Sequence, residues 1–117
     1  MLHAAKQDLE FLRSLEITDL SSRKIFSNYY DVLRAITEAI AALDGYKVYS
    51  HEAFTYYLKE NKKEENAALK FDRLRKLRNN VNYYGKTISK EESKEHKEEI
   101  LKLVKALEHK YLLILKE

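Results

Sequence analysis

The chain contains no proline and only two glycines in 117 residues, and this shortage of turn-forming residues limits the folds open to it. Glycine and proline mark most of the turns that connect strands in β-sandwiches and β-barrels. A fold of many short strands therefore lacks the residues for its connections, whereas a few long helices need little turn chemistry. We predict an all-α fold, an antiparallel up-and-down bundle of four to five helices. A chain of this length builds one hydrophobic core, so residues 1–117 should form a single domain.

Hydrophobic residues recur at helical spacing along most of the sequence. The expected helices cover about 4–16, a second helix to about 43, then 50–60, 66–84, and 89 onward nearly to the C-terminus. The second helix begins after one of the N-cap candidates Thr18, Asp19, Ser21 and Ser22, and the sequence does not choose among them. Gly45 and Gly85 should end the second and fourth helices, because glycine most readily adopts the left-handed backbone that closes a helix. Ser50 is placed to cap the third helix, and Ser89 with Glu92 three residues later forms a capping-box pattern.

The last predicted helix has a wide apolar surface. Residues 90–99 (KEESKEHKEE) are a charged lead-in, expected to be solvated and free to extend beyond the body of the protein. The apolar residues that follow are Ile100, Leu101, Leu103, Val104, Leu107, Tyr111, Leu112, Leu113, Ile114 and Leu115. We interpret most of this surface as core. The alternative is that a share of it forms a homodimer interface, because so small a chain has little interior.

The composition also indicates where in the cell the protein resides. The chain has no cysteine, which excludes a disulfide framework and a thiolate metal site. No apolar run approaches the length of a membrane span, and the N-terminus MLHAAKQDLE lacks the apolar centre of a signal peptide. We therefore expect a cytoplasmic protein that does not engage a membrane. The formal net charge of +3 is too small to indicate nucleic-acid binding by itself, so such a function depends on how the charges are distributed.

Common metal, cofactor and nucleophile motifs are missing from the sequence. No two histidines have the four-residue spacing that lets one helix face hold a metal ion. Two isolated glycines cannot form a phosphate-binding loop, and the serines lack the nucleophile-elbow pattern. We predict no metal site and no cofactor.

Residues 71–85 (FDRLRKLRNNVNYYG) combine an apolar stripe with a polar one. The apolar stripe consists of Leu74, Leu77, Val81 and Tyr84, at helical spacing. The polar stripe beside it consists of Arg75, Arg78 and Asn82. Residues three and four apart lie on one face of a helix, so we expect these polar groups to gather along one edge, next to a groove.

Positive charge is concentrated in the same segment. Five basic residues lie from Lys70 to Arg78, against the single acid Asp72. Asn79, Asn80 and Asn82 follow, and asparagine adds little to a helix that has only a structural role. Both features favour a binding site. The alternative is a solvated flank on which long arginine side chains cover apolar neighbours.

The nine tyrosines include three adjacent pairs. These pairs are Tyr29 with Tyr30, Tyr56 with Tyr57, and Tyr83 with Tyr84. In the first two pairs we expect one ring to pack while the other reaches water. The third pair directly follows the arginine stripe, so rings that stack on a base and guanidinium groups that bind its phosphate would lie close together.

Two stretches of the sequence carry a resemblance to a known family. Residues 29–54 (YYDVLRAITEAIAALDGYKVYSHEAF) contain a tyrosine-bearing helix, a Gly-Tyr-Lys end and a Ser-His that opens the next helix. Residues 77–85 (LRNNVNYYG) are similar to an Arg-Asn-x-x-x-His-x-Tyr motif. In both stretches, and in the order of its helices, the chain resembles the HEPN domain, and the resemblance spans most of residues 1–117.

The resemblance implies a bundle of four or five antiparallel helices, commonly dimeric, in which the motif helices of two subunits line a shared cleft. Many HEPN proteins are metal-independent endoribonucleases, often toxins held in check by a small nucleotidyltransferase partner. Others bind nucleotide or RNA without cleaving it. By position, Arg78 matches the family's arginine, Asn79 the polar residue after it, and Tyr83 the catalytic histidine.

The tyrosine at position 83 bears on catalysis. Metal-free cleavage of RNA needs a group that accepts the 2′-hydroxyl proton near neutral pH, and a phenol with a pKa of about 10 suits this poorly. Tyr83 is still able to bind a phosphate or stack on a base. His51 is a candidate replacement base if the fold brings it near Arg78, although a capping or buried, hydrogen-bonded role is commoner for such a histidine.

We therefore predict a HEPN-like module that binds RNA or a nucleotide phosphate as a homodimer, as the toxin-like component of a pair with a minimal nucleotidyltransferase. The predicted ligand-binding residues are Arg75, Arg78, Asn79, Asn82 and Tyr84, with Tyr83 beside them. One alternative is a metal-independent endoribonuclease in which Arg78 and either Tyr83 or His51 are catalytic. Another is a structural partner that docks a second protein.

Overall fold

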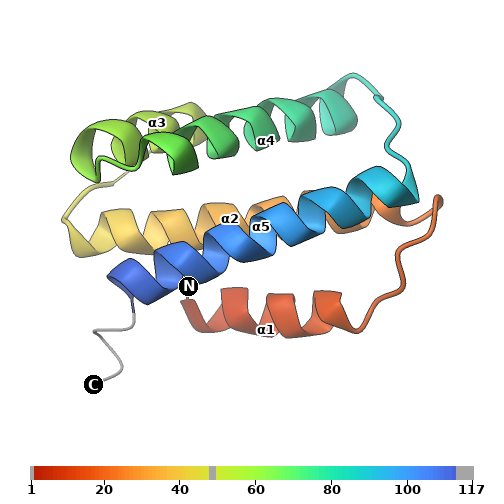
Figure 1. Ribbon diagram of the computed structural model, residues 1–117, viewed down its shortest axis with the longest axis horizontal. Helices are drawn as coiled ribbons and strands as arrows, with labels where there is room; N and C mark the ends of the chain where they lie inside the picture. The colour runs from red at the N-terminus through yellow and green to blue at the C-terminus, as the bar shows by residue number, and fades with distance from the viewer. Residues whose placement is uncertain (1, 48–49, 113–117) are drawn as a thin grey trace.

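The computed structural model describes residues 2–47 and 50–112, and all regular secondary structure in these ranges is helical (Figure 1). The elements are α1 (Leu2–Arg13), α2 (Ser22–Leu43), α3 (His51–Tyr56), η1 (Tyr57–Asn61), α4 (Glu65–Tyr83) and α5 (Lys90–Tyr111). The predicted all-α bundle is confirmed. The largest boundary difference is at α1, which ends at Arg13 and not near residue 16.

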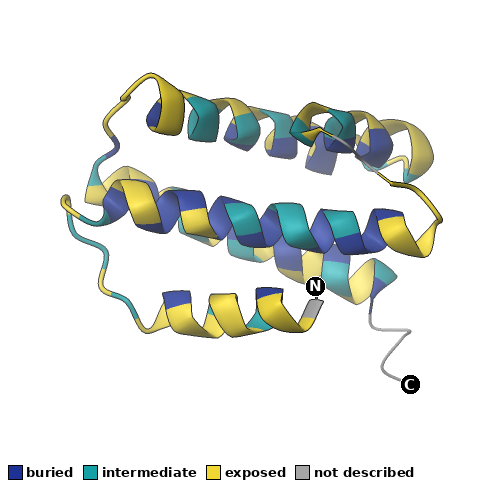
Figure 2. Cartoon of the chain, turned by 180° about the vertical axis from the view of Figure 1, so that it is seen from behind, coloured by how far each residue is buried: buried dark blue, intermediate teal, exposed yellow. Residues whose placement is uncertain are grey.

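Helix α2 is the central element of the bundle. It contacts α1, α3, α4 and α5, which explains why buried residues lie along so much of its length. Figure 2 shows α2 between α1 on one side and the α3–α4 pair on the other, with dark blue buried positions along the helix. A helix covered on several sides needs the wide apolar stripe that its sequence carries.

Helices α2 and α5 run side by side in the same direction. The Ser22 hydroxyl donates to the Ile88 carbonyl at 2.5 Å, and the Ser93 hydroxyl donates to the Ser22 carbonyl at 3.1 Å. One turn further on, the rings of Phe26 and His96 are 5.3 Å apart. The start of α5 is therefore packed against the start of α2, and the expectation that residues 90–99 extend beyond the body was wrong.

Local signals at the helix ends are confirmed. Gly45 and Gly85 have φ values of +81° and +69°, in the left-handed region that glycine favours. The Ser50 hydroxyl accepts a hydrogen bond from the Ala53 amide at 3.2 Å. Ser89 and Glu92 make both bonds of the capping box, at 3.1 Å and 3.2 Å.

The third predicted helix is divided between α3 and the wider π-helical turn η1. The Tyr57 hydroxyl donates to the Asp44 carboxylate at 2.5 Å, and the Lys62 ammonium lies 2.7 Å from the same oxygen. These two bonds keep the pKa of Asp44 below its usual value. They tie both ends of η1 to the end of α2, which accounts for a turn that departs from α-helical geometry.

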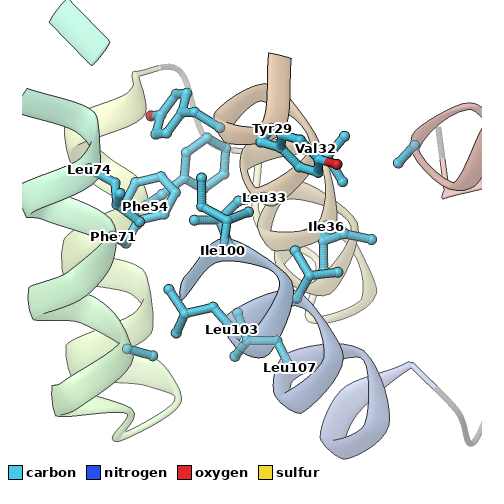
Figure 3. Packing of buried hydrophobic residues seen from close by; sticks show 14 of the residues in the cluster. Tyr29, Val32, Leu33, Ile36, Phe54, Phe71, Leu74, Ile100, Leu103 and Leu107 are labelled. Carbon is cyan, nitrogen blue, oxygen red and sulfur yellow. The ribbon is translucent and has the colours of Figure 1, made fainter. Parts of the chain in front are cut away.

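The burial of the tyrosine pairs differs in part from the expectation. Tyr29 and Tyr30 are both fully buried, so the expectation that one of them reaches water was wrong. The reason is the central position of α2, whose successive faces are covered by different neighbours. Tyr56 is exposed and Tyr57 is buried, as predicted. Figure 3 shows Tyr29 in the core, near Val32.

The apolar surface of α5 belongs to the core of the chain. Ile100, Leu103, Val104 and Leu107 are buried, together with Leu112 just after the helix. Leu113, Ile114 and Leu115 lie outside the described residues. The homodimer interface stays a prediction. No helix in the described ranges is both long and apolar enough to cross a membrane.

Candidate functional site

Arg78 projects from α4 onto the Tyr30 ring of α2. Its guanidinium carbon lies 5.7 Å from the ring centroid, a cation–π distance. Its Nη2 atom is 3.5 Å from an oxygen of Asp31, which makes this the longest ion pair among the described residues. The buried Nε atom has no hydrogen-bond partner there. Arg78 is therefore held in place with part of its donor capacity unused, and its side chain is 18% exposed.

Arg75, by contrast, is paired with an acid of its own helix. Its Nε and Nη2 atoms both donate to one oxygen of Asp72, at 3.2 Å and 2.8 Å. Lys76 binds the other oxygen at 3.0 Å, and the Thr55 hydroxyl also donates to Asp72. Burial raises the pKa of Asp72, but the bonds from Arg75 and Lys76 outweigh it and lower the pKa. Asp72 thus compensates much of the positive charge that the sequence concentrates in this segment.

The asparagines and tyrosines at the end of α4 do not converge on Arg78. The Asn82 side-chain oxygen accepts a hydrogen bond from Ser27 at 2.9 Å, and the Asn79 side chain is half-buried. Tyr83 and Tyr84 are 70% and 81% exposed. Tyr84 was expected on the buried face with Val81, and this was wrong. Helix α4 ends at Tyr83, so the backbone of Tyr84 leaves the helical path and its side chain leaves that face.

His51, the first residue of α3, contacts Tyr30, the residue that Arg78 also contacts. Its Nδ1 atom is 3.1 Å from the Tyr30 hydroxyl, and the two ring centroids are 5.8 Å apart. Burial lowers the pKa of His51, and the positive charges of Arg34 and Arg78 lower it further against the opposing charge of Asp31. The imidazole is therefore neutral at neutral pH.

Tyr30 is the shared contact of this neighbourhood, which we call the Tyr30 cluster: Tyr30, Asp31, Arg34, His51 and Arg78. Burial raises the pKa of Tyr30 to about 12, although the guanidinium groups of Arg78, Arg75 and Arg34 act to lower it. Arg34 is paired with Glu38 at 2.7 Å. The cluster thus contains a neutral phenol, a neutral imidazole and two guanidinium groups, together with the Asp31 carboxylate that contacts Arg78. An anionic ligand would have to take the place of that carboxylate.

Sequence analysis missed three members of this cluster, Tyr30, Asp31 and Arg34. Tyr30 and Arg34 are four residues apart and share one face of α2, which is a signal that the sequence contains. The sequence has no signal for the register between α2 and α4 that brings Arg78 over Tyr30.

The surface next to Arg75 is hollowed between α3 and α4. This cavity has a volume of about 280 Å³ and is lined by Glu52, Thr55, Tyr56, Lys59, Glu65, Ala68, Leu69, Asp72, Arg75 and Lys76. The predicted groove beside the polar stripe therefore exists at Arg75, and Arg78 does not line it. Acids and bases are balanced around the cavity. In the described ranges, no three histidine, aspartate or glutamate residues are grouped so as to hold a metal ion.

No protein-family model matches this sequence, and no curated protein or solved structure matches it either. The resemblance to the HEPN domain stays a prediction from the two stretches that carry it.

Proposed function

We propose that this chain is a HEPN-like module that binds RNA or a nucleotide phosphate at the Tyr30 cluster, with Arg78 as the main contact. One observation carries the proposal. Arg78 is fixed over the Tyr30 ring, its one acidic partner is 3.5 Å away, and its Nε atom is unpaired among the described residues. The Nε atom is buried, so the terminal Nη atoms of this oriented guanidinium group are the donors that would bind phosphate oxygens.

Binding would require Asp31 to give way. The Asp31 side chain is 43% exposed, so it is able to turn into solvent when a phosphate takes its place. A phosphate accepts more hydrogen bonds than the single long contact that it replaces. The cation–π contact with Tyr30 would keep the guanidinium oriented during the exchange.

The other predicted residues have secondary roles in this proposal. Arg75 contributes long-range positive charge, because its Nε and Nη2 atoms already donate to Asp72. The exposed rings of Tyr83 and Tyr84 offer stacking surfaces for bases, and Asn79 and Asn82 offer amide groups beside them.

Fluorescence anisotropy with a labelled single-stranded RNA at low salt tests the proposal. We expect Arg78→Ala to weaken binding about tenfold or more, as the loss of a charged hydrogen-bonding group does. It should also reduce the slope of log K against log salt concentration by about one, because one phosphate contact is lost. Arg23→Ala, which removes an exposed arginine at the start of α2, is the matched control. Salt-independent binding, or equal affinity of the Arg78→Ala and Arg23→Ala proteins, would rule the proposal out.

We also propose the biological context that the resemblance implies: a homodimer, acting in the cytoplasm as the toxin-like component of a pair with a minimal nucleotidyltransferase. Sedimentation of the purified chain tests the dimer. Co-purification with a small nucleotidyltransferase encoded beside it tests the pair. If that complex forms and does not depend on Arg78, the structural docking role becomes the better explanation of the chain.

A second candidate is a metal-independent endoribonuclease with His51 as the base, favoured by the placement of His51 and Arg78 on the same tyrosine. His51 would take the proton from the 2′-hydroxyl, whose oxygen attacks the adjacent phosphorus. The bond from phosphorus to the 5′-oxygen breaks, giving a 2′,3′-cyclic phosphate. His51 then returns the proton to the departing 5′-oxygen, while Arg78 binds the phosphate oxygens.

Incubation with RNA in EDTA tests this candidate. We expect the products to be lost with His51→Ala and with Arg78→Ala, and retained with Tyr83→Phe, because Tyr83 is exposed and makes no hydrogen bond to Arg78 in the described structure. Loss of cleavage with Tyr83→Phe alone would assign the base to Tyr83. No cleavage by the unmodified chain would leave binding as the proposed function.

A further inference from the structure

A groove is lined by residues of α1 and α5. Figure 1 shows α1 on the side of the molecule opposite α3 and α4. The groove forms because α1 packs mainly on α2 and leaves a face of α5 uncovered. The groove has a volume of about 840 Å³ and is open to solvent along one side. Its floor is apolar, with Leu9 from α1 and Leu101, Val104 and Ala106 from α5.

The edges of this groove carry excess positive charge. Arg13, Lys102 and Lys105 line it, and none of them forms an ion pair among the described residues. Glu98 is the acid at the Arg13 end. At the other end, Glu108 is paired with Lys6 at 2.9 Å. The charges that remain uncompensated therefore favour an acidic partner.

We propose that the groove between α1 and α5 binds an acidic amphipathic helix of a partner protein. The lining residues 98–109 of α5 span about 17 Å, which matches three turns of a helix. Leucines on one face of the partner helix would fill the apolar floor, and its flanking carboxylates would meet Arg13, Lys102 and Lys105. A helix is favoured over a small molecule because the open side of the groove leaves room for the partner's own polar face.

A synthetic 18-residue peptide tests this proposal by fluorescence anisotropy with the full chain. The probe carries leucines at i, i+3, i+4 and i+7 and glutamates on both flanks. Two control peptides carry lysines in place of the glutamates, or serines in place of the leucines. We expect the acidic leucine peptide to bind and both controls to bind at least tenfold more weakly. Failure of the acidic peptide to bind below about 100 µM, a weak affinity for a groove of this size, would overturn the proposal.

Variants of the groove locate the binding. Lys102→Glu with Lys105→Glu changes two exposed residues and should weaken peptide binding about tenfold. The matched control is Lys24→Glu with Lys47→Glu, which changes the net charge equally outside the groove.

Two results would contradict the proposal. Equal binding by the groove variant and the charge-matched control would show that the peptide binds elsewhere. Sedimentation of the unmodified chain as a dimer that Lys102→Glu with Lys105→Glu dissociates would assign the groove to a second copy of the chain. Neither result bears on Arg78, which lies on the other side of α2. The RNA-binding proposal is therefore tested independently.

Discussion

The Nδ1 atom of His51 lies 3.1 Å from the hydroxyl oxygen of Tyr30, and this contact ties the first residue of α3 to the middle of α2. Tyr30 is fully buried, so its hydroxyl cannot exchange His51 for water without exposing the core. The guanidinium group of Arg78 lies over the ring of the same tyrosine. The stability of the fold and the geometry of the proposed site thus both depend on the side chain of Tyr30.

Tyr30→Phe should lower the free energy of unfolding by about 1 kcal/mol, because it leaves a half-buried imidazole nitrogen without its hydrogen bond. The phenylalanine ring still fills the core and still faces Arg78. Urea unfolding monitored by circular dichroism measures the change. Tyr56→Phe is the matched control, since Tyr56 is exposed and should give an unchanged midpoint. Equal midpoints for the two variants would mean that the contact with His51 adds nothing to stability.

The stability of the protein should fall as the pH is lowered through the range of the histidines. Burial lowers the pKa of both His51 and His96 from the usual 6.5. The unfolded chain therefore binds protons more readily than the folded chain does. The stability from these groups is complete above about pH 6.5 and is lost as the pH falls toward their folded pKa values.

Urea unfolding at pH 7.5 and pH 5 measures this loss. Carboxylates such as Asp44 and Glu64 have lowered pKa values, so their contribution is lost only at more acidic pH. We expect the difference between pH 7.5 and pH 5 to shrink when His51 and His96 are both changed to glutamine. An unchanged difference in this double variant would mean that other groups cause it.

Asp31→Asn should strengthen RNA binding if Arg78 is the phosphate contact. Asp31 is the acid that a phosphate must displace, and its ion pair with Arg78 is long and partly exposed, so we expect it to be worth about 1 kcal/mol. Removing its charge should therefore raise the affinity by up to about fivefold, measured by anisotropy at low salt. Glu38→Gln removes an acid from Arg34 and is the matched comparison. Weaker binding by the Asp31→Asn protein would mean that Asp31 supports the site and does not compete for it.

Features that depend on a few neighbouring residues were predictable from the sequence. The caps at Ser50 and Ser89 and the left-handed glycines at 45 and 85 follow from local chemistry, and the structure has all of them. The pairing of Arg75 with Asp72 is equally local, because residues three apart on a helix are neighbours. It was overlooked because the acid was treated only as a minority charge within a basic segment.

Features that depend on the packing of distant segments were not predictable. Arg78 meets Asp31 across 47 positions of sequence, and no periodicity in either helix fixes that register. The burial of both Tyr29 and Tyr30 follows from neighbours on several sides of α2, whereas a hydrophobic stripe predicts one buried face. The groove between α1 and α5 likewise depends on how closely two helices approach, and both have ordinary amphipathic sequences.

Ser89→Ala should lower the free energy of unfolding by about 1 kcal/mol, the usual value of an N-cap side chain. Its hydroxyl accepts from the Glu92 amide at 3.1 Å, and the residue follows Ile88, whose carbonyl holds Ser22. Loss of the cap should therefore weaken the packing between the starts of α2 and α5. Amide hydrogen exchange should become faster at the start of each of these two helices. Lys90→Ala, one residue further on and exposed, is the control that should change neither quantity. Faster exchange in α5 alone would mean that the two helix starts open independently.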